Sequence, residues 1–380
     1  MKIAIVQDDL MRRGGAEQVA LTFHRAFPEA PIYTLCYQPD LTYPEFKSAT
    51  IITSSYQRIA KTERQMKRYF FPLGLMAMQQ MKIEGFDVVL MSTTFCAKYV
   101  KISKNTVVIC YCHNPFRLAW EPESYPQIAG ASFFKKKLYQ LVIKTLRKLD
   151  KDSTKKINYF IANSKIVAGR IKKAYGEDKE ITIVNPPVKC NDFYISSDSK
   201  DYYLVVSRFE PYKKVDLVLS VFKELNIPLM VVGNGSMADK IRDMADNNIT
   251  IKSKVPKDEL AKLFANCKAL IFPQLEDYGI TPLEANAAGR PVIAYGKGGV
   301  LETMEPYTND ASQASALFFD EQNEQSLKKS LKQFETLQFN PEYIRAHARK
   351  FDEQVFIDKI VGLIHSKFQE HNPKVLAVKK

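Results

Sequence analysis

Two glutamates lie close together in the stretch ALIFPQLEDYGITPLEANAAGRPVIAYGKGG, where Glu276 and Glu284 have seven residues between them. The strand-like run before them ends at Pro273, so Glu276 falls in a loop. Pro282 lies near the first position of the helical pattern that follows, where proline is favoured. Carboxylates so placed could accept hydrogen bonds from sugar or ribose hydroxyls. They could equally complement the dipole of the helix start, and both interpretations stand at this point.

The backbone between the two glutamates favours an anion. Gly279 permits a tight turn, and the amides of Gly279, Ile280 and Thr281 would then face a ligand at the start of the helix. Free amides and the positive end of the helix dipole together attract phosphate groups. The segment therefore predicts a site for a phosphorylated ligand that also carries hydroxyl groups.

Two cations follow the first strand of the same half of the chain, in VVSRFEPYKKVD. Arg208 comes directly after the strand, and Lys213 lies just before a helix that begins near Val215. Arginine offers a planar fork and lysine a mobile point charge, a combination suited to a diphosphate whose charge rises as its glycosidic bond breaks. Without a ligand to bind, the same residues would be ordinary surface charges.

Glycines occur at two further loops that follow strands. Gly14 and Gly15 precede a helix in DDLMRRGGAEQ, where bare amides could approach a ligand or simply allow a turn. Gly233 and Gly235 in VVGNGSMADKI follow a strand with the G-x-G-x-x-A spacing of a dinucleotide-binding loop. That fingerprint also requires an acidic residue about 20 positions later, at the end of the next strand. The segment IKSKV offers only lysines there, which argues against an NAD-dependent oxidoreductase.

The elements that must position these residues alternate regularly. Short apolar runs and helical patterns succeed one another, as expected for parallel βαβ units. The same alternation of strand and helix patterns begins again after a proline pair and a Ser/Asp-rich stretch near residue 200. We therefore predict an α/β protein with two doubly wound Rossmann-like domains sharing a central cleft. The N-terminal domain covers 1–195 and the C-terminal domain 196–354, with a terminal helix at about 355–375 that packs back on the first.

Composition narrows the possible environment and partners. The chain of 380 residues has 46% hydrophobic and 26% charged residues, enough for two cores. It starts without a leader pattern and has no apolar run long enough to span a bilayer, which predicts a cytoplasmic protein. The six scattered cysteines predict free thiols, and Cys110, Cys112 and His113 lack the further ligands of a typical zinc site. The net charge of +13 implies an anionic partner.

These motifs together resemble retaining glycosyltransferase family four, of GT-B fold. The matching elements are GGAE, SRFEPYKKVD, GNG, EDYGITPLEANAAGRPVIAYGKGG and the terminal helices, so the resemblance covers almost the whole chain. It implies that Arg208 and Lys213 hold the donor diphosphate, Glu276 the donor sugar and Glu284 the ribose. It also implies that Gly14 and Gly15 flank the donor phosphates and the acceptor. Gly233 and Gly235 of the GNG element, with Gly279, Ile280 and Thr281, are predicted to bind the donor as well.

The resemblance adds a histidine and a donor. His113 in CYCHNPFRLAW is similar to the family's histidine near the reacting carbon, and among five histidines it alone lies at a strand end in an aromatic, proline-containing loop. The same stretch resembles mannosyltransferases of O-antigen and capsule assembly, which suggests GDP-mannose as donor. Lys214 stands where the family often has glycine. This replacement is compatible with the same branch, although it can change the local turn, and it favours Lys213 as the phosphate-binding lysine.

The implied reaction is hexosyl transfer (EC 2.4 class) with retention and without a metal or other cofactor, and the nucleotide-sugar donor is a substrate. The metal-dependent GT-A class uses an Asp-x-Asp element at a strand end, whereas Asp150-Lys151-Asp152 lies in a lysine-rich helical stretch. A sugar-nucleotide epimerase of the same fold remains an alternative. Nucleic acid is not expected as a partner, because no stacking platform accompanies the basic segment.

The expected acceptor is a glycan or a lipid-linked glycan of surface polysaccharide. Residues 61–82 mix cations with apolar side chains, and three lysines at 135–137 follow two phenylalanines. Such segments suit the inner face of a cell membrane with anionic lipid, where the protein would lie peripherally. Ordinary amphipathic helices packed on the N-terminal sheet would have the same composition.

Overall fold

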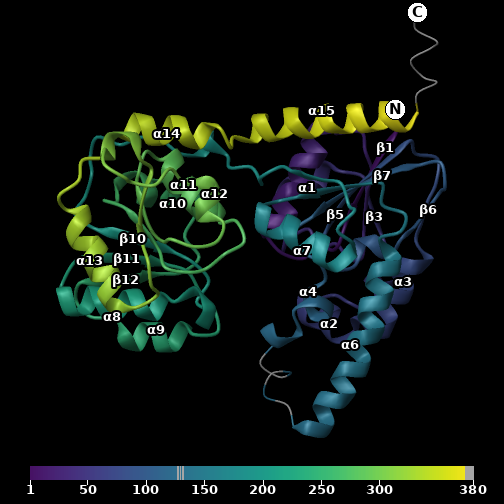
Figure 1. Cartoon of the computed structure of the whole chain (residues 1–380), viewed down its shortest axis with the longest axis horizontal. Coiled ribbons are helices and arrows are strands. Elements are labelled where there is room, and N and C mark those ends of the chain that lie inside the picture. The colour runs from purple at the N-terminus through teal and green to yellow at the C-terminus, as the bar shows by residue number, and fades with distance from the viewer. Residues whose placement is uncertain (126–127, 129, 131, 373–380) are drawn as a thin grey trace, which may run out of the picture. The chain divides into compact units, whose positions relative to one another are not determined.

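The computed structural model describes residues 1–125, 128, 130 and 132–372, without the side chains at 133 and 134. It divides into two compact units, each described here by itself (Figure 1). The N-terminal unit comprises Met1–Asn185 and the chain from Ile357 onward, and the C-terminal unit comprises Pro186–Phe356.

The N-terminal unit is built on a parallel sheet whose seven strands within the described residues follow the order β3-β2-β1-β5-β7-β8-β9. Every residue of its central strands β5 and β7 is buried, because helices and loops cover both faces. The strands are β1 (Ile3–Gln7), β2 (Ile32–Thr34), β3 (Ile51–Thr53), β5 (Val88–Thr93), β7 (Val107–Cys112), β8 (Tyr159–Ala162) and β9 (Ile181–Ile183), and a separate pair is formed by β4 (Lys82–Ile83) and β6 (Lys101–Ile102).

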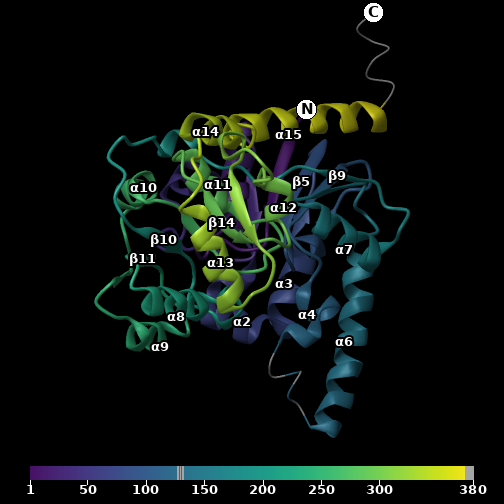
Figure 2. The same cartoon turned by 60° about the vertical axis from the view of Figure 1, so that its left-hand side comes forward.

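Helices connect these strands. In Figure 1 and Figure 2 the long helix α6 extends beyond the sheet of its own unit. The helices are α1 (Gly15–Ala26), α2 (Glu63–Tyr69), the π-helical η3 (Phe70–Gly74), α3 (Leu75–Gln80), α4 (Arg117–Trp120), α6 (Phe133–Ser153), α7 (Lys165–Tyr175) and, at the end of the chain, α15 (Glu353–His371). Short 3-10 turns are η1 (Pro44–Ser48), η2 (Ser55–Arg58), η4 (Ala97–Tyr99) and η5 (Pro122–Ser124).

A buried ion pair fixes the base of α6. Lys98 and Asp150 are 1% and 0% exposed, and their Nζ and Oδ1 atoms lie 2.9 Å apart. Asp150 also accepts hydrogen bonds from the indole of Trp120 at 2.8 Å and the hydroxyl of Tyr175 at 2.9 Å. A buried charge persists only when it is paired and hydrogen-bonded in this way. The first Asp of the Asp-x-Asp letters therefore holds α4, α6 and α7 together.

The C-terminal unit has a parallel six-stranded sheet in the order β12-β11-β10-β13-β14-β15. Its strands are β10 (Tyr203–Val206), β11 (Leu229–Val232), β12 (Ile249–Lys252), β13 (Leu270–Phe272), β14 (Val292–Tyr295) and β15 (Ala316–Phe319). Its helices are α8 (Val215–Leu225), α9 (Ala238–Met244), α10 (Lys257–Asn266), α11 (Ile280–Ala287), α12 (Val300–Thr303), α13 (Glu324–Phe334) and α14 (Pro341–Arg349), with 3-10 turns η6 (Cys190–Asp192), η7 (Pro211–Lys213) and η8 (Ala311–Gln313).

The chain passes between the two units twice. Both of these points lie near the predicted domain boundaries but do not coincide with them. Residues 186–195, which the sequence assigned to the N-terminal domain, belong to the C-terminal unit. They are held there because the Val188 amide donates to the carbonyl of Phe351 at 3.0 Å and Arg345 binds the carbonyl of Phe193 at 2.9 Å. Near the end of α15, Lys367 contacts Glu180 of the N-terminal unit at 2.6 Å.

In each sheet the strand order reverses beside the first strand of that unit. β1 lies between β2 and β5, and β10 lies between β11 and β13. Loops that leave the carboxyl ends of strands on either side of such a reversal diverge and leave room for a ligand. The predicted site residues follow β1, β10 and their neighbours β11 and β13, except His113, which follows β7, one strand further from β1 than β5.

Candidate functional site

In the C-terminal unit, the loops after β10 and β13 meet through their charged side chains. The ammonium group of Lys213 forms an ion pair with Glu276 Oε1, and Gln274 Nε2 donates to the same oxygen at 3.2 Å. Lys213 is 8% exposed although it carries a full charge. Such burial requires the partner carboxylate, so the pair sets the position of both groups.

A tyrosine joins Arg208 to this pair. The exposed Arg208 donates through Nη2 to the hydroxyl of Tyr212 at 3.1 Å. The ammonium nitrogen of Lys213 lies 5.2 Å from the centre of the same ring, within the range of a cation–π contact. The structure thus brings Arg208, Lys213 and Glu276 into one cluster, which we call the cation cluster. Sequence reasoning did not single out Tyr212.

The loop that carries Glu276 is supported by the glycines after β14. The amide of Gly299 donates to the carbonyl of Glu276 at 2.8 Å. A Cβ atom at Gly299 would lie 2.3 Å from Tyr278 Cα, and one at Gly298 would lie 2.5 Å from the Glu276 carbonyl oxygen. Only glycine permits this approach, so the sequence GKGG holds the EDYG loop in place.

Helix α11 begins immediately after this loop. Gly279 precedes it with φ +92°, a backbone conformation that favours glycine, and no described side chain caps the helix. The first amides of a helix have no acceptor within it, so those of Ile280 and Thr281 are available to an anion. The predicted turn is therefore present at this helix start, and the contact of these amides with a ligand remains a prediction.

Glu284 lies one turn further along α11 and is partly buried. Burial raises the pKa of its carboxyl group to about 7; Asp192 adds to this rise and Lys257 opposes it. Among the described residues, no hydrogen bond or ion pair reaches this carboxylate. A carboxyl group whose pKa is strongly raised is a common feature of ligand sites.

Replacing Glu284 by glutamine is expected to stabilise the unliganded protein at pH 8. Its folded-state pKa is raised, so the ionised carboxylate lowers stability as pH rises from about 4.5 to about 7. The gain should reach about 1–3 kcal/mol at pH 8 and fade toward pH 4.5. Urea unfolding at pH 5 and pH 8 measures it, with Glu342→Gln at the exposed start of α14 as control. An equal difference at both pH values would contradict the assignment.

Gly233 and Gly235 have a packing role in the structure. A Cβ atom at Gly233 would lie 1.9 Å from the Ser207 carbonyl oxygen, and one at Gly235 would lie 2.5 Å from that of Phe209. The GNG loop therefore lies directly against the loop that carries Arg208. Only glycine permits this close packing, and the predicted contact of Gly233 and Gly235 with the donor remains a prediction.

In the N-terminal unit, the loop after β1 contains a charge cluster that sequence reasoning missed. Arg12 donates from its three nitrogens to Glu17 at 3.0 Å, Glu63 at 2.7 Å and Asp9 at 2.9 Å. Asp9 and Glu17 are buried, and burial raises the pKa of Asp9 to about 6 and that of Glu17 to about 7. The signal in the sequence was the row of charges DDLMRRGGAE around the glycine pair.

Gly14 allows this cluster to form. A Cβ atom there would lie 2.5 Å from Glu17 Oε2, and Gly15 opens α1 directly after it. Neither glycine has a positive φ angle. The pair therefore gives room to a buried carboxylate, and the predicted contact with phosphate at Gly14 and Gly15 remains a prediction.

Asp8 organises the next loop. Its carboxylate accepts from the Thr93 hydroxyl at 2.8 Å, from the hydroxyl of Thr94 at 2.8 Å, and from the backbone amides of Cys96 at 2.8 Å and Ala97 at 2.7 Å. One carboxylate therefore fixes the chain between β5 and η4. The residues on this loop include Phe95, which lines a pocket described below.

His113 follows β7 at the same sheet edge. Its Nε2 atom lies 2.9 Å from the Ser92 hydroxyl, and its backbone amide donates to the Thr93 carbonyl at 2.9 Å. Burial lowers the pKa of the imidazole to about 4, with a smaller opposing effect from Asp8. The ring is therefore neutral near pH 7 and could orient a ligand by hydrogen bonding, but not as a cation.

The cysteines before His113 are structural. Cys110 and Cys112 lie buried in β7, and burial raises the pKa of Cys112 to about 12 and that of Cys110 well above its usual value. Thiolates are the form that binds metals, so both thiols are poor ligands. All six cysteines are buried and free, as predicted.

Comparison with known proteins gives families for both units. Residues 13–192 match the family model for Glycosyltransferase Family 4, and residues 193–351 match that for Glycosyl transferases group 1. A similar curated protein is "Alpha-1,3/1,6-mannosyltransferase ALG2" of Dictyostelium discoideum, 24% identical over 253 residues, covering 54% of this chain and 57% of that protein. Another is "O-antigen chain mannosyltransferase RfbU" of Salmonella typhimurium, 25% identical over 226 residues, covering 57% and 59%. The chain thus matches less than two thirds of either relative.

Solved structures share the fold. HepE of Anabaena, determined in complex with UDP, gives a TM-score of 0.69 at 14% identity and covers 96% of this chain and 100% of its own. Sucrose-phosphate synthase from Thermosynechococcus elongatus gives 0.72 at 13% identity, covering 97% and 100%. At these identities the likeness shows the fold alone. The predicted GT-B class, with two Rossmann-like sheets, is confirmed.

Proposed function

Because the chain belongs to the glycosyltransferases, with a family 4 domain followed by a group 1 domain, we propose that it transfers a hexose with retention from a nucleotide-activated donor. The observation that carries the proposal is the cation cluster beside the uncapped start of α11. Cations and free amides in one place suit a pyrophosphate better than any other common ligand. The proposed donor is GDP-mannose, and the names of the two mannosyltransferase relatives support mannose as its sugar.

Each residue has a defined part in the proposed reaction. Arg208 and Lys213 stabilise the departing diphosphate. The amides of Ile280 and Thr281 donate hydrogen bonds to the same diphosphate. Glu276 positions Lys213 and contacts the donor sugar. Glu284 accepts hydrogen bonds from the ribose. No metal is needed in this scheme, because fixed cations supply the charge that develops on the leaving group.

The attack on the sugar is mostly a matter of placement. The neutral His113 orients the donor sugar through a hydrogen bond. The acceptor oxygen bonds to the anomeric carbon on the face from which the diphosphate leaves, the bond to the diphosphate breaks, and the hydroxyl proton passes to the departing phosphate oxygen. Holding the two reactants in position accounts for much of the barrier that such an enzyme removes. The proposed acceptor is a glycan or lipid-linked glycan of surface polysaccharide.

A thermal-shift screen against sugar nucleotides and free nucleotides tests this function, since a bound ligand raises the unfolding temperature by mass action. We expect GDP-mannose and GDP to give the largest shifts, including in the presence of a chelator. Proton NMR of the transferred sugar then reports its anomeric configuration. Absence of binding by any sugar nucleotide would contradict the proposal. Activity lost in chelator and restored by manganese would contradict its metal-independent part.

We further propose that the outer half of α6 rests on an anionic membrane. Among the described residues, no helix is long and apolar enough to cross a bilayer. Helix α6, however, exposes Leu138 at 61%, Leu141 at 65% and Val142 at 47%. These side chains share one face by their i, i+3, i+4 spacing, and the exposed lysines at 135–137 and Lys144 accompany them.

Vesicle flotation tests this contact. The protein should float with vesicles containing anionic lipid at low salt and dissociate as salt rises, because the lysines act through screened charge. Replacing Leu138 and Leu141 together by aspartate should abolish flotation without unfolding the protein, since both side chains are exposed. If the wild-type protein stays unbound at low salt, this part of the proposal is wrong.

A further inference from the structure

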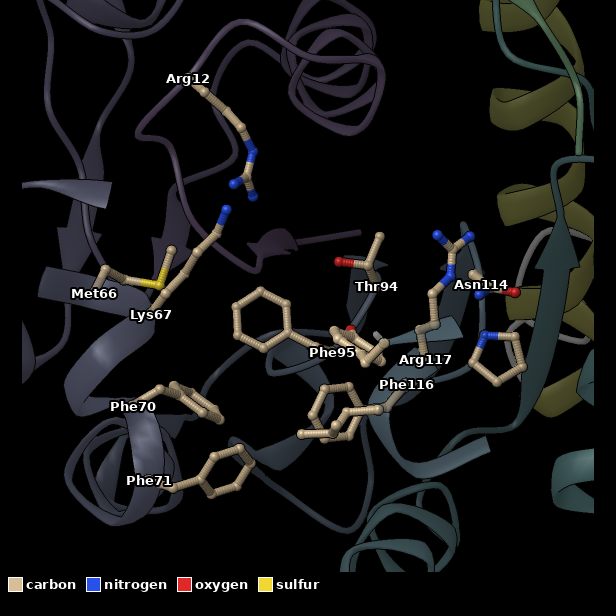
Figure 3. A pocket seen from close by; sticks show the side chains of 13 residues that line it. Arg12, Met66, Lys67, Phe70, Phe71, Thr94, Phe95, Asn114, Phe116 and Arg117 are labelled. Atoms are coloured by element: carbon tan, nitrogen blue, oxygen red, sulfur yellow. The ribbon is translucent and has the colours of Figure 1, made fainter. Parts of the chain in front are cut away.

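The N-terminal unit contains a pocket that the proposed donor site does not account for. It has a volume of about 600 Å³, within the usual range of small-molecule sites. Its walls include the rings of Phe70, Phe71, Phe95 and Phe116, which gather on one side in Figure 3. We call it the phenylalanine pocket.

The four rings form a continuous apolar surface. Phe70 and Phe95 meet edge to face with their centres 5.2 Å apart, and Phe71 and Phe116 stack at 6.2 Å. Met66 adds a flexible side chain to the same wall. Helix α2, the segment η3 and the loops after β5 and β7 supply these residues, so the fold assembles the surface from distant parts of the chain.

The polar groups in the pocket are already engaged with protein. The hydroxyl of Thr94 donates to Asp8 at 2.8 Å, and Asn114 Oδ1 accepts from Arg170 at 3.1 Å. A glycan needs many hydrogen bonds to compensate for the loss of water around its hydroxyls. The phenylalanine pocket offers few, which favours a hydrocarbon ligand over a sugar.

Cations border the apolar wall. In Figure 3 the side chains of Arg12 and Lys67 point toward one another, and Glu63 binds both, at 2.7 and 2.6 Å. Arg117 lies on the opposite side of the rings and is 52% exposed. A ligand with an anionic end could exchange such partly exposed contacts for its own.

The apolar wall continues to the outside of the protein. Phe71 lines the pocket and is still 40% exposed. Its neighbours Tyr69, Leu73 and Met76 are 42%, 44% and 50% exposed. Soluble proteins rarely group exposed apolar side chains without a binding partner. A hydrocarbon chain bound between the rings could therefore stay in contact with apolar side chains where it emerges from the pocket.

From these observations we propose that the phenylalanine pocket binds the hydrocarbon chain of a phosphate-linked lipid, the carrier of the acceptor glycan. The inference rests on the proposed transferase function and specifies its acceptor. The rings surround one end of the hydrocarbon chain, and the exposed residues of 69–76 contact the part of the hydrocarbon that lies outside the pocket. The bordering cations attract the phosphate.

The single tryptophan provides a direct probe. Trp120 lies on α4 and packs on the cluster that contains Phe116, so its fluorescence should respond to occupancy of the pocket. We would titrate the full chain with butyl, hexyl, octyl and decyl phosphate below their aggregation concentrations. The affinity should rise about tenfold for every two methylene groups added until the pocket is filled. Inorganic phosphate and a chain-free mannose oligosaccharide should leave the fluorescence unchanged.

Two variants localise the effect. Phe71→Ser should lower the affinity for octyl phosphate about tenfold. Ile59→Ser, at a similarly exposed apolar residue of the same unit that lies outside both the pocket and residues 69–76, should leave octyl phosphate binding unchanged. An affinity that does not depend on chain length, an equal loss in both variants, or binding of the oligosaccharide instead would overturn the proposal.

The donor site gives the separating control. Each variant is also titrated with GDP and tested for hydrolysis of the donor without acceptor. GDP binding and donor hydrolysis that persist while alkyl phosphates fail to bind would sink the pocket proposal and leave the transferase function standing. Alkyl phosphate binding without any nucleotide binding would instead support the pocket and contradict the donor site.

Discussion

Replacing Lys213 by alanine is expected to lower kcat/KM by about 10²–10³-fold while the protein stays folded. Lys213 supplies charge where the diphosphate leaves, and Glu276 and the Tyr212 ring hold its ammonium group in place. The charge is already fixed before the reaction, so no cost of reorganisation arises during bond breaking. Most of the loss should appear in kcat, because the interaction strengthens as the bond breaks.

The matched control is Lys240→Ala. Lys240 also forms an ion pair, with Asp216 at 2.9 Å, but it is 57% exposed and lies on α9. This variant removes a lysine and an ion pair without touching the cation cluster, and it should retain nearly full activity. Steady-state kinetics with the donor found in the thermal-shift screen, together with thermal unfolding, compare the two variants. A loss under threefold in Lys213→Ala with intact folding would refute its assigned role.

Replacing Glu276 is expected to cause a second large loss of turnover. Its effect on GDP affinity should depend on whether Lys213 is present. Glu276→Gln should lower turnover by about 10²-fold, since Lys213 loses its partner and the donor sugar loses a contact. Combining it with Lys213→Ala should restore GDP affinity about tenfold relative to Lys213→Ala alone. The lone carboxylate left by that single change repels the diphosphate, and the second change removes its charge.

Calorimetric titration of GDP into the four proteins of this cycle measures the coupling. Turnover of the double variant should be no better than that of the weaker single variant, because both groups are then absent from the reaction. Losses of GDP affinity that simply add would mean that Lys213 and Glu276 do not share the diphosphate site.

Local patterns predicted much of the fold. The helix predicted after the Gly14-Gly15 pair is α1 (Gly15–Ala26), the helix predicted to begin near Val215 is α8 (Val215–Leu225), and the terminal helix predicted at about 355–375 is α15 (Glu353–His371). Strands buried on both faces and helices with one apolar face leave a clear periodic signal in the sequence. The exact domain boundary left no such signal in the sequence, because residues 186–195 are held by hydrogen bonds to residues far along the chain.

The candidate site was predictable where motif and backbone coincide. Gly279 takes the positive φ that its turn requires, and the loop of Arg208 meets that of Glu276 as two parallel strands end side by side. The buried cluster of Arg12, Asp9 and Glu17 was not foreseen, because its pairing depends on tertiary contacts. The packing of Gly233 on Ser207 likewise depends on the distance between two loops, which spacing alone does not give.

The phenylalanine pocket shows the same limit. Residues 61–82 were recognised as basic and aromatic, yet the partners of Phe70 and Phe71 lie at Phe95 and Phe116. A stretch of sequence indicates that apolar side chains need cover, and only the fold shows what covers them. The contacts that define this pocket join segments more than twenty residues apart.

A structure of the full chain with GDP bound tests the central claim most directly. The account predicts the pyrophosphate at the carboxyl ends of β10 and β13, with Arg208, Lys213 and the amides of Ile280 and Thr281 within about 3 Å of its oxygens, and the ribose hydroxyls on Glu284. A pyrophosphate bound elsewhere, with Arg208 and Glu284 both in contact with solvent only, would contradict it.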